Sequence, residues 1–127
     1  PDELAGEAGS LLARTDFAVF GARHAGRWVG FVEVGTRDVA EGCATSPVGY
    51  VEGIWVDPAF RRQGIARRLA VVAARWAVRR GYRELASDTG IDNRASQVFH
   101  TRIGFAETER LVTYRLALTG RSRPGLP

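Results

Sequence analysis

A buried strand that leads through a short turn into an arginine-rich loop and then a helix constrains this chain more than any other feature. The strand spans residues 48–56 and is nearly apolar, as expected for a strand covered on both faces. Asp57 and Pro58 begin the turn, and the loop of residues 61–66 leads into the helix. The apolar stripe of that helix consists of Ile65, Leu69, Val72 and Trp76. This order of elements predicts an α/β fold.

The start of this helix has the chemistry of an anion site. The first backbone N–H groups of a helix have no partner within it, and the helix dipole adds about half a positive charge there. Gly64 lets the backbone come close to a phosphate, and Ala66 keeps the first turn narrow. Positive charge around the loop comes from Arg61, Arg62, Arg67 and Arg68. The junction therefore predicts a pyrophosphate site.

The other segments predict one domain with a mixed sheet flanked by helices. The expected elements are the end of a helix at 1–13, a hairpin of strands 17–23 and 28–35, a long loop at 36–47, a strand at 84–88, a helix at 93–103 and a final strand at 111–118. The domain is expected to span residues 1–118, and the turn-rich composition of residues 119–127 predicts a flexible tail.

Gly53 interrupts the apolar strand and predicts a bulge there. Such a bulge would splay this strand from its neighbour at residues 84–88. The N–H and C=O groups from Ile54 through Trp55 to Val56 would then lack a partner. An extended molecule with amide groups can bond to such an edge as an added strand.

Two carboxylates are expected to flank this opening. Glu52 precedes the bulge and Asp88 ends the neighbouring strand. A partly buried pair of like charges raises at least one pKa, which suits a proton acceptor, and it also attracts a polycation. The alternative is that Glu52 pairs with an arginine and that Asp88 caps the loop at Gly90.

Composition narrows the classes of function. The net charge is +4, the pI is about 10.2, and many arginines lie between residues 61 and 83. No groove-reading motif or series of stacking aromatics accompanies them, so a solvated helix face is favoured over a nucleic-acid footprint. No apolar run reaches the ~18 residues of a membrane span, and a cytoplasmic location is the default expectation. Cys43 is the single cysteine, and a small residue without a chemical role is favoured over a catalytic thiol at this position.

The sequence resembles the GNAT superfamily of N-acetyltransferases. Arg61-x-x-Gly64-x-Ala66 after a strand is similar to the acyl-CoA pyrophosphate loop of that superfamily. Further motifs are similar to one branch, the aminoglycoside 6'-N-acetyltransferases. They are Ser46-Pro47, Val51-Glu52-Gly53-Ile54, Ala86-Ser87-Asp88, Asp92-Asn93, Ser96, His100, Gly104-Phe105 and Glu107-Thr108-Glu109-Arg110.

The resemblance implies a GNAT fold, with a mostly antiparallel sheet and a splay between its two central strands. It implies acetyl-CoA as cosubstrate, no metal, a homodimer, and acetylation of the 6'-amino group of an aminoglycoside, which confers antibiotic resistance. Members of the superfamily normally begin with a strand and a first helix, which are expected to be missing before residue 1. Other acceptors, namely a polyamine, an amino acid or a protein N-terminus, stay open because the fold does not fix the acceptor. An acyl-CoA-sensing or nucleic-acid-binding module without catalysis is the alternative of another class.

The resemblance also implies roles for individual residues. Asp88 is the implied base and Glu52 an acceptor contact; Asp38 and Glu41 in the long loop are expected beside the acceptor pocket. His100 could protonate the leaving thiolate, contact the cofactor or pack against Phe99. The expected cofactor contacts are Ile54, Trp55, Val56, Arg61, Arg62, Gln63, Gly64, Ile65, Ala66, Arg67, Asn93 and Ser96. Asn93 could equally be a helix cap.

Overall fold

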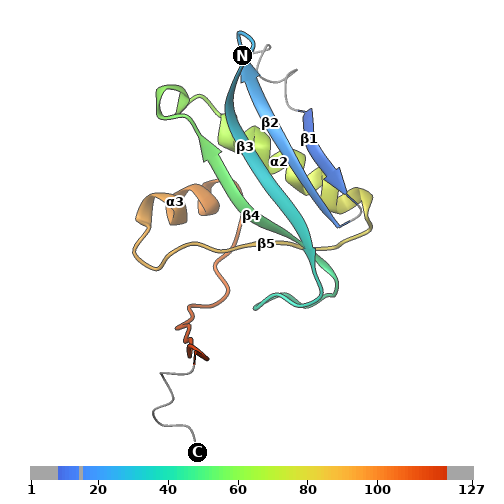
Figure 1. Cartoon of the computed structure of the whole chain (residues 1–127), viewed down its shortest axis with the longest axis vertical. Coiled ribbons are helices and arrows are strands. Elements are labelled where there is room, and N and C mark those ends of the chain that lie inside the picture. Colours follow the sequence, from blue (N-terminus) through green and yellow to red (C-terminus); the bar gives the residue numbers. More distant parts are fainter. Residues whose placement is uncertain (1–8, 15, 120–127) are drawn as a thin grey trace, which may run out of the picture.

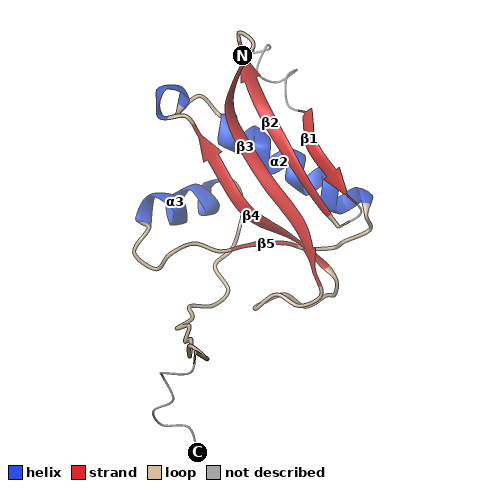
Figure 2. Cartoon of the chain, in the orientation of Figure 1, coloured by secondary structure: helices blue, strands red, loops and turns tan. Residues whose placement is uncertain are grey.

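The structure is a computed structural model that describes residues 9–14 and 16–119. Five strands form one sheet in the order β1-β2-β3-β4-β5 (Figures 1 and 2). The strands are β1 (Gly9–Arg14), β2 (Phe17–His24), β3 (Arg27–Arg37), β4 (Val48–Val56) and β5 (Leu85–Ser87). The helices are the short 3-10 helix η1 (Pro58–Phe60), α2 (Ile65–Arg79) and α3 (Arg94–Arg102). Neighbouring strands are antiparallel except for β4 and β5, which are parallel, so the sheet is mixed and mostly antiparallel as expected.

The predicted hairpin is formed by β2 and β3. Ala25 and Gly26 between them have φ angles of 52° and 76°. Two successive residues with positive φ make a turn whose twist matches that of antiparallel strands. The β2–β3 pairing then runs from the His24–Arg27 pair to the Phe17–Gly35 pair. The other edge of β3 pairs with β4.

The helix α2 lies across one face of the sheet, behind β2, β3 and β4 in Figure 1. Its buried side chains are Ile65, Leu69, Ala70, Ala73, Trp76 and Ala77, which confirms the predicted apolar stripe apart from Val72, which is only half-buried. The helix approaches β3 closely at Gly30, where a Cβ would stand 2.9 Å from the Trp55 carbonyl oxygen and 3.3 Å from Leu69 Cδ1. This packing fixes the direction in which the start of α2 points.

The predicted bulge and splay are present in β4. Glu33 pairs with Gly53 and Val34 pairs with Val51, so Glu52 is the extra residue in the strand. On its other side β4 pairs with β5 only from Gly49 to Val51. β5 ends at Ser87, whereas β4 continues to Val56, and no described strand lies beside the rest of that edge. We call residues 52–56 of β4 the open edge.

Two of the predicted elements are wrong. Residues 9–13 were expected in a helix, but they belong to β1, because pairing with β2 overrides a short local periodicity. The predicted beginning of that helix, residues 1–8, lies outside the described residues, as do residues 120–127 of the predicted tail. Residues 111–118 were expected as a final strand, but residues 105–118 have no helix or strand.

The C-terminal segment leaves the sheet and runs away from it (Figure 1). Val112, Tyr114 and Leu118 are 80%, 84% and 83% exposed. A strand requires a neighbour for its N–H and C=O groups, and this segment has none among the described residues. None of the described helices is long and apolar enough to cross a membrane.

Candidate active site

The loop before α2 presents backbone N–H groups to solvent. Gly64 is the N-cap residue of α2, with φ 81° and ψ 9°, and no side chain caps the helix. Residues 61–64 are exposed, and the first turn of α2 contains no acidic residue. A Cβ added to Gly64 would find no atom within 4 Å, so the space in front of this backbone is open. The first N–H groups of α2 are therefore accessible to an anion, and the pyrophosphate site stays a prediction.

Arg61 connects this loop to the open edge of β4. Its Nε donates a hydrogen bond of 3.1 Å to the carbonyl oxygen of Val56, the last residue of the strand. Arg62, the next residue, has a φ angle of 64°, which turns the chain toward Gly64. We call residues 61–64 the anion loop. This loop begins beside the end of the open edge, so one extended molecule can contact both.

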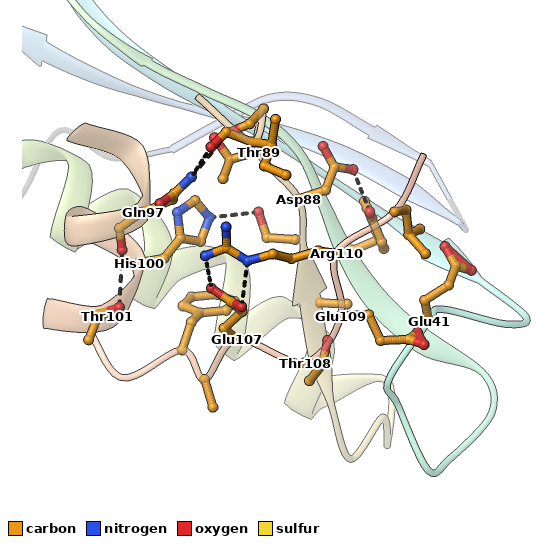
Figure 3. A pocket seen from close by; sticks show the side chains of 18 of the residues that line it. Glu41, Asp88, Thr89, Gln97, His100, Thr101, Glu107, Thr108, Glu109 and Arg110 are labelled. Carbon is orange, nitrogen blue, oxygen red and sulfur yellow. Dashed lines mark hydrogen bonds and ion pairs between the residues drawn. The ribbon is translucent and has the colours of Figure 1, made fainter. Parts of the chain in front are cut away.

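A cavity of about 530 Å³ lies at the opposite end of the open edge (Figure 3). Ser87 and Asp88 at the end of β5 line it, as does His100 of α3. Glu41 from the loop between β3 and β4 forms another wall, and the segment of residues 105–113 closes it from a third side. The lining thus contains four carboxylates, those of Glu41, Asp88, Glu107 and Glu109, and Glu107 is paired with Arg110.

Two side chains, Arg37 and Tyr50, connect the two predicted carboxylates. Arg37 of β3 donates two hydrogen bonds to Glu52, from Nε to Oε2 at 3.0 Å and from Nη2 to Oε1 at 2.8 Å. Its guanidinium carbon lies 3.5 Å from the centre of the Tyr50 ring. The Tyr50 hydroxyl in turn donates to Oδ2 of Asp88, which faces the cavity in Figure 3. We call Arg37, Tyr50, Glu52 and Asp88 the acid cluster.

Both carboxylates of the acid cluster already have partners. Burial and the hydrogen bond to Asp88 raise the pKa of Tyr50 well above its usual value, so the phenol stays protonated and donates. The hydrogen bonds to Glu52 raise the pKa of Arg37. The alternative interpretation that Glu52 pairs with an arginine is confirmed. The other part of that alternative is wrong: Asp88 bonds Tyr50, and the Gly90 carbonyl accepts from the Asn93 N–H and from Gln97 instead.

His100 is held by three hydrogen-bond partners. Its Nδ1 lies 2.8 Å from the Ser96 carbonyl oxygen and 3.3 Å from Ser96 Oγ, and its Nε2 lies 2.9 Å from Ser87 Oγ. A carbonyl oxygen only accepts, so we assign the proton of the neutral ring to Nδ1 and an acceptor role to Nε2. His100 also packs edge-on against Phe99 and Phe105. Both ring nitrogens therefore have partners within the protein, and the role of His100 as a proton donor to a thiolate stays a prediction.

Glu84 orders the long loop that carries Glu41. Its carboxylate accepts hydrogen bonds from the Ala44 N–H at 2.9 Å and the Thr45 N–H at 2.7 Å, and a further one from the Thr45 hydroxyl. The hydroxyl and N–H groups of Thr45 and Ala44 lower the pKa of Glu84. Burial raises the pKa of the Cys43 thiol, which opposes a nucleophilic role.

The other predicted site residues lie apart from the acid cluster. Asn93 caps α3, with its Oδ1 accepting from the Ser96 N–H at 3.1 Å, so the cap interpretation is confirmed, and any contact with a cofactor stays a prediction. Asp38 accepts a hydrogen bond from Ser46 through its carbonyl oxygen and does not line the cavity. Among the described residues, no three His, Cys, Asp or Glu side chains are placed to hold a metal ion.

Sequence reasoning missed Arg37, Tyr50 and Glu84. Arg37 ends a strand and Glu84 precedes one, and neither position forms a motif by itself. Tyr50 offered a weak signal, because alternation along β4 places it two residues before Glu52 on the face opposite α2. Only the tertiary arrangement brings these side chains to the two predicted carboxylates.

Comparison with known proteins matches this chain to one family and to relatives that share one name. Residues 2–105 match the family described as "Acetyltransferase (GNAT) family". Aminoglycoside N(6')-acetyltransferase type 1 of Serratia marcescens is 45% identical over 120 residues, which cover 93% of this chain and 82% of that protein. The protein of the same name from Salmonella typhimurium is 41% identical over 117 residues, covering 91% and 81%.

Two solved structures of AAC(6')-Iy are also similar to this chain. The complex of AAC(6')-Iy with the bisubstrate analogue CoA-S-monomethyl-acetylneamine superposes with a TM-score of 0.80 at 41% identity, over 82% of this chain and 71% of that one. The complex of AAC(6')-Iy with CoA gives a TM-score of 0.80 at 42% identity, over 82% and 78%.

Proposed function

The chain belongs to the GNAT acetyltransferase family, and we propose that it transfers the acetyl group of acetyl-CoA to the 6'-amino group of an aminoglycoside antibiotic. Relatives that cover more than nine-tenths of this chain at 41–45% identity carry the name of this activity. The observation that carries the proposal in the structure is the open edge of β4, which lies between an anion loop and a cavity lined by carboxylates.

The cofactor side of the site runs from the anion loop along the open edge. The N–H groups at the start of α2 and the arginines of the loop would hold the pyrophosphate, and Gly64 leaves room for it. The pantetheine amides would bond to the backbone from Ile54 to Val56 as an added strand. The same arm would pass near Asn93 and Ser96 at the start of α3. The loop contacts of this proposal are Arg61, Arg62, Gln63, Gly64, Ile65, Ala66 and Arg67.

The acceptor side of the site is the acid cluster and its cavity. Asp88 would accept the proton of the incoming amine, and the Tyr50 hydroxyl orients its carboxylate. Glu41 and Glu52, with Asp38 nearby in the loop, would attract the ammonium groups of the acceptor. The backbone N–H near Ile54 is the candidate donor to the oxyanion that develops on the thioester carbonyl. His100 is the candidate donor to the departing thiolate.

The acetylation would confer antibiotic resistance. It removes a positive charge and a hydrogen-bond donor from the drug, which weakens the binding of the drug to anionic RNA. Acetyl-CoA is a metabolite of the cytoplasm, and we place the enzyme there because it consumes this cosubstrate.

A thiol-release assay tests the proposal. The protein is incubated with acetyl-CoA and with kanamycin or tobramycin, and free CoA thiol is measured over time. We expect release that depends on the aminoglycoside and is absent with an aminoglycoside that has a 6'-hydroxyl in place of the amine. Release only with spermidine, an amino acid or a peptide would assign a different acceptor to the same family fold.

We also propose that two copies of this chain associate through residues 111–118, which we call the arm. The arm alternates exposed apolar side chains, Val112, Tyr114, Leu116 and Leu118, which are 50–84% exposed. Figure 1 shows it extending from the body without a partner. A contiguous exposed apolar surface of this kind is typical of an interface, and a homodimer would cover it.

Light scattering coupled to size-exclusion chromatography checks the dimer. Tyr114→Asp together with Leu116→Asp should convert a particle of twice the chain mass into one of the chain mass, because two carboxylates would be buried in the interface. Val78→Asp is the matched control, since Val78 is 70% exposed on α2. A wild-type protein that elutes as a monomer at micromolar concentration would contradict the proposal.

A further inference from the structure

We propose that Arg37 selects the acceptor: its guanidinium occupies the position on Glu52 that an ammonium group of the acceptor takes, so an acceptor must displace it to bind. This inference rests on the proposed function and adds a residue that sets the choice of substrate. Arg37 lines the cavity, whereas Glu52 does not, so Glu52 meets the cavity through the arginine.

The contacts of Arg37 resemble those expected of a bound cationic group. Its guanidinium makes two parallel hydrogen bonds to Glu52, at 2.8 and 3.0 Å. It also stacks on the face of Tyr50 at 3.5 Å, where the ring attracts positive charge. The Tyr50 hydroxyl bonds Asp88, so Arg37 and Tyr50 together link the two carboxylates proposed to handle the amine. Arg37 therefore offsets one of their two negative charges when no acceptor is present.

The pair between Arg37 and Glu52 is open enough to be exchanged. The two side chains are 41% and 37% exposed, so water competes for both and the pair adds little to the stability of the fold. An aminoglycoside carries several ammonium groups, and one of them can replace the guanidinium on Glu52 while others approach Asp88 and Glu41. A small amine with a single charge gains only one of these contacts. Arg37 should therefore disfavour small monoamines and admit polycations.

Calorimetric titration of the CoA-loaded protein with tobramycin tests the inference without requiring turnover. Arg37→Gln should lower the Kd for tobramycin by about two- to fivefold, because the drug no longer competes with an exposed ion pair. Arg27→Gln is a matched control: Arg27 lies on the same strand, pairs with Asp57 at 2.7 Å and carries the same charge. We expect the control to leave the Kd unchanged within error.

A Kd that rises or stays constant in Arg37→Gln would overturn the inference, since Arg37 would then position Glu52 or have no part in binding. An equal fall in Arg27→Gln would also overturn it, because the effect would come from net charge alone. In a Glu52→Gln background, Arg37→Gln should no longer lower the Kd, and a persisting fall would contradict exchange on Glu52. Thiol release by the wild type is measured separately. Absence of thiol release would contradict the proposed function, whereas the tobramycin titrations test the role of Arg37.

Discussion

Asp88→Asn is expected to lower kcat by about 10²- to 10⁴-fold, the usual contribution of a general base. Asparagine has nearly the same shape as aspartate but cannot accept the proton of the attacking amine. It can still accept the hydrogen bond from Tyr50, so the acid cluster should keep its arrangement. The affinity for CoA should stay within about twofold, because the open edge and the anion loop do not involve this side chain. Steady-state thiol release and calorimetric titration with CoA measure the two quantities.

Asp92→Asn provides the control for this substitution. Asp92 is exposed, lies four residues after Asp88, and does not line the cavity, so the same chemical change there should leave kcat unaffected. Turnover at the wild-type rate in Asp88→Asn would remove Asp88 from the proposed chemistry. The proton would then have to leave through water or another carboxylate.

Gly64→Val is expected to reduce kcat/KM for acetyl-CoA by about 100-fold, which corresponds to losing one or two hydrogen bonds to a charged phosphate. The φ angle of Gly64 is 81°, which a β-branched residue rarely adopts, so the loop would have to rearrange. A Cβ there would point into open space, and the protein itself would not block it. The obstructed partner would be the pyrophosphate. Kinetics at varied acetyl-CoA concentration measure the loss.

Gly81→Val is the control that distinguishes the loss of pyrophosphate contacts at Gly64 from the effect of backbone strain alone. Gly81 has a φ angle of 82°, and a Cβ there also meets nothing within 4 Å, but it follows the far end of α2. Both variants should lose a similar free energy of unfolding in urea, because both place valine at positive φ. If Gly81→Val also raised the KM for acetyl-CoA as much as Gly64→Val does, the anion loop would not be the pyrophosphate site.

Local signals in the sequence were sufficient to predict the centre of the fold. An apolar run, a glycine that interrupts it and a helix start without a cap are each encoded within a few residues. These signals predicted β4, a bulge at Gly53 and a loop that leads into α2 at Gly64, and the structure has the bulge with Glu52 as its extra residue. The splay followed from the same bulge, and it was confirmed by the short β4–β5 pairing.

The errors at the two ends have a common physical cause. Whether a short stretch forms a strand depends on a neighbour that the local sequence does not encode. Residues 9–13 find such a neighbour in β2 and form a strand in spite of a helical spacing. The arm has the alternation of a strand, but no described strand lies beside it.

The acid cluster illustrates what residue patterns cannot supply. The pattern placed Glu52 and Asp88 at one opening but treated them as two bare like charges. Arg37 and Tyr50 join them through contacts between strands, and these partners decide how the charges are balanced before an acceptor arrives. Roles for Glu52, Asp88 and His100 remain predictions until the variants are measured.

The most direct test of the whole account is an experimental structure of the protein with CoA and tobramycin bound together. We expect the pyrophosphate on the N–H groups beside Gly64, the pantetheine amides bonded to β4 between Ile54 and Val56, and the 6'-amine within hydrogen-bonding distance of the Asp88 carboxylate. Pantetheine bound away from the open edge, or a 6'-amine on the far side of the sheet from Asp88, would contradict it.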